Sequence, residues 1–140
     1  MREILFRGKR IDNGEWVEGW YYKRIVHLNT FHQNVVVDAI EVYDGENPLS
    51  IAYYSVDPET VGQCTGLTDK NGKKIFEGDI VECWSEGVCA RGTVQQNKGG
   101  LWIIYPAWQK RIMWGLCPDE YSRTDVEIIG NIHDNPELMK

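Results

Sequence analysis

The sequence of 140 residues has no apolar run that approaches the roughly 18 residues needed to span a bilayer. Its charged opening, Met-Arg-Glu-Ile-Leu-Phe-Arg-Gly, is unlike a secretory signal peptide. We therefore expect a cytoplasmic protein without a membrane partner. The length is that of one domain, or of two small lobes that share a core.

Metal-binding patterns are also missing. A zinc site needs cysteine pairs with two to four residues between them, whereas Cys83 and Cys89 are separated by five. His27, His32 and Asp38 could form a facial metal triad, but hydrogen-bonded or solvent-facing histidines are far more common, so we expect no metal. Because cytoplasmic thiols stay reduced, all the cysteines are interpreted as small buried side chains. They are Cys64, Cys83, Cys89 and Cys117.

Signatures of cofactor binding and catalysis are not found either. The 14 glycines form neither a G-x-x-x-x-G-K-[ST] loop nor a G-x-G-x-x-G fingerprint. No serine lies in a nucleophile elbow. Glu77 and Asp79 could act as a carboxylate pair, but their position around Gly78 already explains them as turn residues. We expect no cofactor, no catalytic residue and no enzymatic activity.

Negative charge exceeds positive charge. Fifteen Lys and Arg residues face 21 Asp and Glu residues, which gives a formal net charge of -6. A protein that coats DNA neutralises phosphates with Lys and Arg, so the balance disfavours a general DNA-coating role. It suits a protein that meets other proteins.

Strand patterns fill most of the chain, and turn-forming residues arrive every eight to twelve residues, which is typical of small β-sandwiches and barrels. No window has sustained helical periodicity. We expect a mainly β protein. An N-terminal antiparallel sheet in residues 1–57 would pack on a small SH3-like barrel in residues 58–140. The boundary near Asp57 and Pro58 is soft, and we expect the two lobes to unfold as one unit.

Two turns lie in the central segment. Asn71 and Gly72 both tolerate positive φ, which a type I′ hairpin turn requires. Gly78 occupies the third position of a type II turn, where positive φ favours glycine. The Asp79 carboxylate can accept a nearby backbone N–H.

The central segment contains the motifs Asp69-Lys70-Asn71-Gly72-Lys73 and Glu77-Gly78-Asp79-Ile80-Val81. With these motifs it resembles the YopX family. The resemblance extends to both ends of the chain and implies a mainly β protein of bacteriophages and prophages, within a bacterial host cell, whose biochemical role is unassigned. It supplies no catalytic residues. The matching motifs are Thr60-Val61-Gly62-Gln63, Thr65-Gly66-Leu67, Asp69-Lys70-Asn71-Gly72-Lys73, Glu77-Gly78-Asp79-Ile80-Val81, Gly14-Glu15-Trp16-Val17 and Ile129-Gly130-Asn131-Ile132.

Aromatic residues are plentiful, with six Trp and seven Tyr. Several lie among cations in the later half of the chain, as in small barrels that stack the bases of single-stranded nucleic acid. Aromatic residues also fill the cores of β domains and the hot spots of protein interfaces, and core or interface packing is the preferred interpretation. The candidate binding surface comprises Trp102, Tyr105, Trp108, Lys110 and Arg111.

Two functional hypotheses follow. The first is a non-enzymatic module that binds a protein partner, with a second copy of the chain as one candidate, since self-association would protect edge strands. The alternative is a module that binds single-stranded nucleic acid through the candidate surface.

Overall fold

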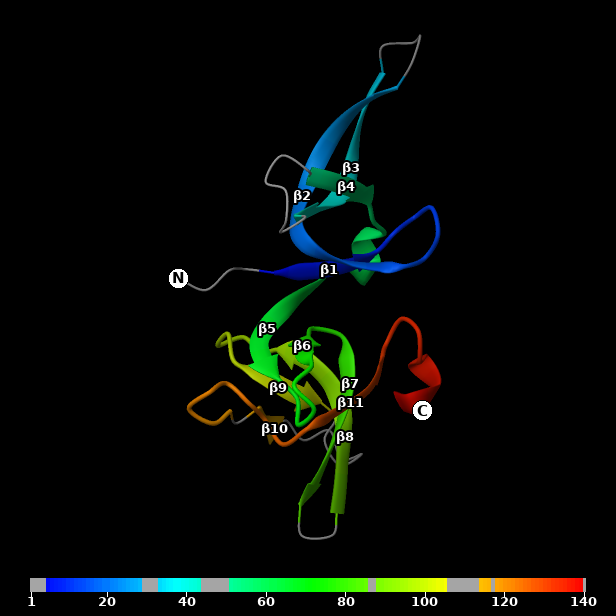
Figure 1. The fold of residues 1–140 in the computed structure, drawn as a ribbon. Helices are drawn as coiled ribbons and strands as arrows, with labels where there is room; N and C mark the ends of the chain where they lie inside the picture. The colour runs from blue at the N-terminus through cyan, green and yellow to red at the C-terminus, as the bar shows by residue number, and fades with distance from the viewer. Residues whose placement is uncertain are drawn as a thin grey trace. The chain divides into compact units, whose positions relative to one another are not determined.

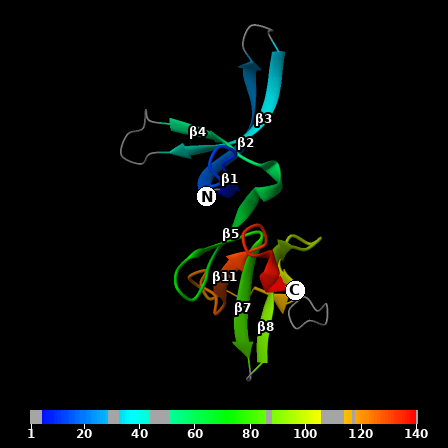
Figure 2. The ribbon, with the colours of Figure 1, turned by 90° about the vertical axis from the view of Figure 1, so that its right-hand side faces the viewer.

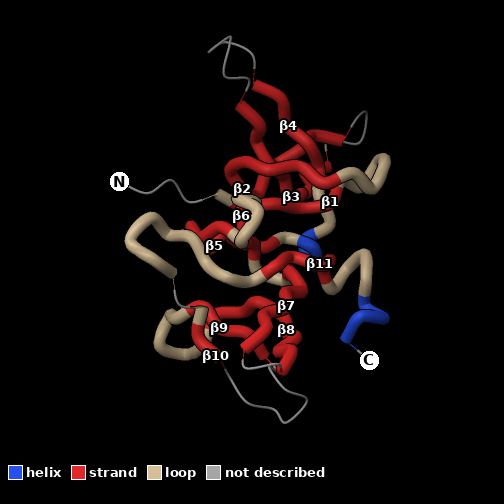
Figure 3. The backbone as a smooth tube through the Cα atoms, turned by 60° about the horizontal axis from the view of Figure 1, so that its bottom comes forward, coloured by secondary structure: helices blue, strands red, loops and turns tan. Residues whose placement is uncertain are grey.

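The computed structural model describes residues 5–28, 33–43, 51–85, 88–105, 114–116 and 118–139. Strands dominate these ranges, so the mainly β expectation is confirmed (Figure 3). No described helix is long and apolar enough to cross a membrane. The chain divides into two compact units, Met1–Gln63 and Cys64–Lys140. Joint unfolding of two lobes stays a prediction.

The N-terminal unit is built on an antiparallel sheet with neighbouring strands in the order β4-β3-β2-β1. The first two residues of β5 (Gly62–Thr68) pair with β1. The other elements are β1 (Phe6–Lys9), β2 (Trp16–Leu28), β3 (Gln33–Tyr43), β4 (Ile51–Ser55) and the 3-10 turn η2 (Pro58–Thr60) (Figure 1).

One face of this sheet forms the core of the N-terminal unit. Ile40 and Val56 are completely buried on it. The rings of Phe6 and Tyr21 lie 5.7 Å apart on the same face. The Tyr21 hydroxyl donates a hydrogen bond to the Asp38 carboxylate, and this bond is the main reason that the pKa of Tyr21 lies above its ordinary value.

The C-terminal unit contains a five-stranded antiparallel sheet in the order β10-β9-β8-β7-β11, together with the β5–β6 hairpin. Strands β7 and β8 of this sheet lie side by side (Figure 2). The sheet is open, and no closed barrel is found in the described part of the chain, so the SH3-like barrel is not confirmed. The elements are β6 (Lys74–Phe76), β7 (Asp79–Ser85), β8 (Val88–Gln96), β9 (Trp102–Tyr105), β10 (Trp114–Gly115), β11 (Glu127–Asn131) and the 3-10 turn η3 (Pro136–Met139).

The core of the C-terminal unit lies on one face of this sheet. The alternation of side chains along each strand brings one residue in two to this face. Trp102, Leu116 and Ile128 are partly buried against the core. The buried residues of this core cluster are Leu67, Ile75, Val81, Cys83, Val94, Ile104 and Val126.

Three turns of the C-terminal unit share one hydrogen-bond pattern. In each, a side-chain oxygen of the first residue accepts the backbone N–H groups two and four positions later. The first residues are Asp69, Asn97 and Asp119. The residue three positions after each has positive φ, namely Gly72 at 81°, Gly100 at 85° and Ser122 at 63°.

The turn at Asn71 and Gly72 therefore differs from the type I′ turn that the sequence suggested. Type I′ needs positive φ at both central residues, and among the described non-glycine residues only Ser122 has it. The physical reason is Asp69, whose carboxylate holds the N–H of Asn71 at 2.9 Å. This bond stabilises a longer turn in which Gly72 alone takes positive φ.

Asp69 also accepts a hydrogen bond from outside its own turn. Its side chain is buried with 1% exposure, and its second carboxylate oxygen accepts the N–H of Ile128 on β11 at 3.2 Å. Asp119 is exposed, and the N–H of Arg123 that it accepts is the main reason that its pKa lies below the ordinary value. Only Asp69, of these two carboxylates, connects its turn to the sheet.

Gly78 is the turn residue directly before β7, the strand that follows the central hairpin, and its φ is 93°. Its N–H donates to the Val94 carbonyl, and its own carbonyl accepts from Ile132, both at 2.9 Å. The buried Asp79 carboxylate accepts the N–H of Phe76 at 2.8 Å. This segment is thus held by backbone bonds to two other parts of the unit.

Replacement of Gly78 by valine should lower the free energy of unfolding by about 1–3 kcal/mol, because a β-branched residue is strained at positive φ. Steric crowding is not the cause of this loss, since a Cβ at this position would meet Ile132 at an ordinary 3.7 Å. Gly78→Asn should lose less, because asparagine tolerates this region. Thermal unfolding followed by circular dichroism measures both variants. Wild-type melting of Gly78→Val would contradict the turn.

Asp69→Ala should lower the free energy of unfolding by about 2–3 kcal/mol, because it leaves buried N–H groups without an acceptor. Asp119→Ala removes the same turn pattern at an exposed site, where water replaces the carboxylate, so its loss should be clearly smaller. Urea unfolding of the two variants gives the comparison. Equal losses would show that the buried bond to Ile128 adds nothing.

Candidate functional site

The structure places the two described residues of the candidate binding surface on opposite faces of β9. Trp102 lies on the core side of β9 and packs against the hydrophobic cluster. Tyr105 is three residues later and therefore faces the opposite side. Trp108, Lys110 and Arg111 lie outside the described residues. A continuous stacking surface that includes both Trp102 and Tyr105 is therefore not formed on β9.

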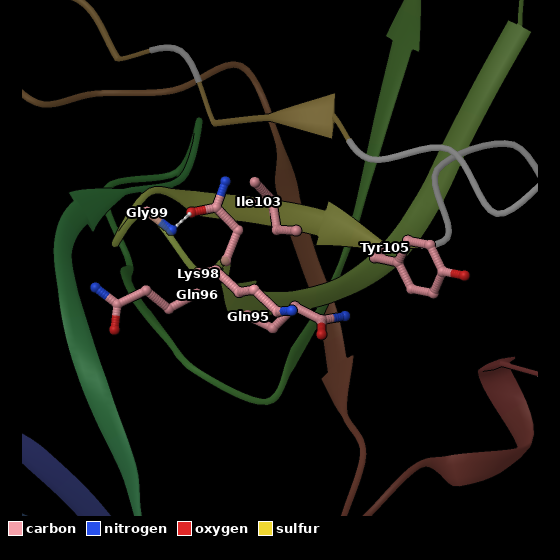
Figure 4. Close-up of a pocket in the computed structure, with 7 residues that line it drawn as sticks. Gln95, Gln96, Lys98, Gly99, Ile103 and Tyr105 are labelled. Carbon is pink, nitrogen blue, oxygen red and sulfur yellow. Dashed lines mark hydrogen bonds between the residues drawn. The ribbon is translucent and has the colours of Figure 1, made fainter.

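Tyr105 instead lines a pocket beside the turn between β8 and β9. The pocket has a volume of about 510 Å³ (Figure 4), within the range of small-molecule sites. Antiparallel pairing places Gln95 on β8 opposite Ile103 on β9. Both side chains therefore lie on the same face of the sheet as Tyr105. The lining residues are Gln95, Gln96, Asn97, Lys98, Gly99, Ile103 and Tyr105.

The pocket combines an apolar base with polar side chains. Ile103 is 7% exposed and supplies buried apolar surface. Asn97 Oδ1 accepts the N–H of Gly99 at 2.9 Å, which leaves the Asn97 amino group as a donor. Lys98 is exposed. The sequence did not indicate this pocket. Its polar lining comes from a turn, and the sequence of that turn predicts only a connection between two strands.

A second surface lies on the N-terminal unit, on the sheet face opposite Ile40. Register places Trp20, Glu41 and Tyr53 in one row across β2, β3 and β4. Tyr22 and Arg24 follow Trp20 on the same face of β2, because residues two apart share a face. We call Trp20, Tyr22, Arg24 and Tyr53 the aromatic face.

The side chains of the aromatic face contact one another. The rings of Tyr22 and Tyr53 meet edge to face, with centroids 6.1 Å apart. The Arg24 guanidinium lies 4.5 Å from the centre of the Tyr53 ring. Burial is the main reason that the pKa of Tyr22 is raised. Trp20 and Tyr53 nevertheless stay exposed, at 51% and 45%.

Cations and an aromatic ring also meet at the start of the same face. Arg7 and Lys9 lie 4.8 and 5.6 Å from the centre of the Trp16 ring. Cation–π contacts of this kind are favourable at exposed sites. The alternating run Trp16, Trp20, Tyr22 was visible in the sequence. Its alternation predicts a strand, but the grouping with Tyr53 depends on the pairing of β2, β3 and β4.

Neither surface contains a metal-binding cluster among its described residues. Among the described ranges, no group of three His, Cys, Asp or Glu side chains is arranged to hold a metal. Cys83 is buried, while Cys64 and Cys89 are partly exposed, and all three are free thiols. Burial is the main reason that the pKa values of Cys83 and Cys89 are raised. Cys117 lies outside the described residues.

The fold and these surfaces define a class of protein: a mainly β chain of two antiparallel sheets that exposes clustered aromatic residues. The model of the YopX protein family matches residues 5–140, so the chain belongs to the YopX family. Over the whole of both chains it is similar to the crystal structure of protein EF1440 from Enterococcus faecalis, with 24% sequence identity and a TM-score of 0.52. That likeness concerns the fold alone. Comparison with curated proteins gives no match.

Truncation of the aromatic face should affect stability little. Trp20→Ala and Tyr53→Ala should each change the free energy of unfolding by less than about 1 kcal/mol, because surface substitutions rarely cost more. Ile40→Ala, in the core of the same sheet, should cost about 2–5 kcal/mol. Denaturant unfolding of the three variants tests this. A loss at Trp20 as large as that at Ile40 would place Trp20 in a core.

Proposed function

We propose that the protein is a non-enzymatic protein-interaction module that binds its partner through the aromatic face. The setting that we propose is the cytoplasm of a bacterial host cell during a phage or prophage programme, in line with the family resemblance. The composition and exposure of the aromatic face support the proposal.

The observation that carries the proposal is the grouping of Trp20, Tyr53 and Arg24 on an open sheet face. Trp, Tyr and Arg are the residues most enriched among interface hot spots, because they bury large areas and also donate hydrogen bonds. Trp20 and Tyr53 are about half exposed, so a partner would remove much apolar surface from water. Tyr22 and Arg24 already hold the Tyr53 ring, which lowers the entropic cost of binding.

The partner that this face fits is a second copy of the chain. The same face of the sheet carries both charge signs, with Glu41 on β3 opposite Trp20 and Arg24 four residues further along β2. Twofold pairing could therefore set Arg24 of one copy against Glu41 of the other, as a self-complementary interface requires. Tyr53 lies on β4, the edge strand of the sheet, and edge strands are the natural sites of pairing between chains.

Size-exclusion chromatography with light scattering should give a dimer whose fraction rises with protein concentration. The double variant Trp20→Ala with Tyr53→Ala should weaken association by at least about tenfold, because hot-spot truncations cost 2 kcal/mol or more. Trp84→Ala with Tyr121→Ala is the matched control. It also removes one Trp and one Tyr with high exposure, 68% and 69%, and Tyr121 also lies against an arginine.

The control variant should associate like the wild type. A monomer at the highest concentrations would overturn the second copy as partner. Equal weakening by the two double variants would overturn the aromatic face as the contact.

A further inference from the structure

Charge is distributed unevenly along the chain. Residues 87–118 contain no Asp or Glu, and their four cations are Arg91, Lys98, Lys110 and Arg111. This segment charge of +4, in a chain of net charge -6, leaves -10 for the remaining residues. All the residues that line the pocket belong to the acid-free segment. Of these four cations, Lys98 lines the pocket, Arg91 is paired with Glu82, and Lys110 and Arg111 lie outside the described residues. The lining therefore carries a lysine and no carboxylate, which favours an anionic ligand.

The pocket itself offers three kinds of contact. Tyr105 and Ile103 supply aromatic and apolar surface, and Gln95 supplies an amide that both donates and accepts. Lys98 supplies a cation on the turn. Figure 4 shows the Tyr105 ring at one end of the pocket and the turn with Gly99 at the other.

These contacts match a ligand that has a flat ring, polar ring edges and a negative charge. A neutral sugar would use the ring and the amides but would have no need of the cation. A nucleotide uses all of them, since its base stacks on aromatic rings and its phosphate pairs with Lys or Arg. The pocket is also open at the surface beside a hairpin turn, which one nucleotide of a longer strand requires.

We infer that this pocket binds one nucleotide of a single-stranded nucleic acid. The base lies against Tyr105 and Ile103, its edge faces the Gln95 amide, and a phosphate pairs with Lys98. The site is independent of the aromatic face, which belongs to the other unit, so either proposal can fail without the other.

Fluorescence anisotropy with the full chain tests the inference. The probe is a labelled oligothymidine of about 12 nucleotides, at salt concentrations of about 50 and 200 mM. The wild type should bind at the lower salt concentration and more weakly at the higher one. Lys98→Glu should weaken binding about tenfold, because it places a negative charge at the phosphate position.

Lys73→Glu is the matched control for Lys98→Glu. Lys73 is also an exposed lysine at a hairpin turn of the same hydrogen-bond pattern, so its replacement changes the net charge equally. It should alter affinity by less than about twofold, because bulk charge acts weakly at a distance in salt. Equal weakening by the two variants would mean that net charge alone is responsible and would overturn the site.

Tyr105 distinguishes base stacking from simple attraction. Tyr105→Ala should weaken binding by about 5- to 100-fold, since each stacked base contributes on that scale. Tyr105→Phe keeps the ring and should retain affinity within about threefold of the wild type. Circular dichroism checks that both variants are folded. Equal affinities for the wild type and a folded Tyr105→Ala would overturn the stacking role.

Two further ligands identify the source of the nucleotide. A duplex of the same length should bind more weakly than the single strand, because its bases are already stacked. Free thymidine monophosphate should compete only at far higher concentration. Competition by the mononucleotide at the oligonucleotide's own concentration, with the same Lys98 dependence, would overturn the nucleic-acid strand in favour of a free nucleotide. Lack of binding to every ligand at low salt would overturn the inference entirely.

Discussion

The arrangement of the C-terminal unit depends on side chains that cap their own turns. Asp69, Asn97 and Asp119 each hold two backbone N–H groups and thereby fix where the chain reverses. The position of the reversal sets the strand register, and the register decides which side chains reach the core. On β9, a slip of one residue would exchange the buried Ile104 for its neighbours and turn Tyr105 from the pocket towards the core. The Asn97 cap of the turn before β9 thus determines both the packing of Ile104 and the position of Tyr105 in the pocket.

In the N-terminal unit, the alternation of side chains along the strands separates a buried face from an exposed one. Ile40 and Val56 fill the buried face, while the other face holds Trp20, Tyr22 and Tyr53. Exposing apolar rings of this size to water costs free energy, and a monomer gains nothing in return. Their mutual contacts and the Arg24 guanidinium keep them ordered, so the face is already arranged for a partner. The two units therefore present different surfaces: the aromatic face carries mixed charge, and the pocket combines Tyr105 with Lys98 and side-chain amides.

The sequence was sufficient for the mainly β architecture, because turn residues and alternating apolar residues are local signals. The positive φ of Gly72 and Gly78 also follows from local chemistry. The detailed turn at Asn71 did not, since the decisive acceptor is the Asp69 carboxylate two residues earlier. The placement of Trp102 against the core and the grouping of Tyr22 with Tyr53 depend on register between strands, which residues near in sequence do not encode.

β5 runs across the division between the two units. Gly62 and Gln63 pair with β1, whereas Cys64 and Thr68 pair with β6. One continuous strand therefore pairs with β1 through its first residues and with β6 through its later ones. When β1 frays, the first residues of β5 lose their partners, and the entropy gained there loosens the register of the residues that follow. Amide protons at Cys64 and beyond should consequently exchange with solvent at rates that respond to substitutions made far away, in the sheet of Trp20.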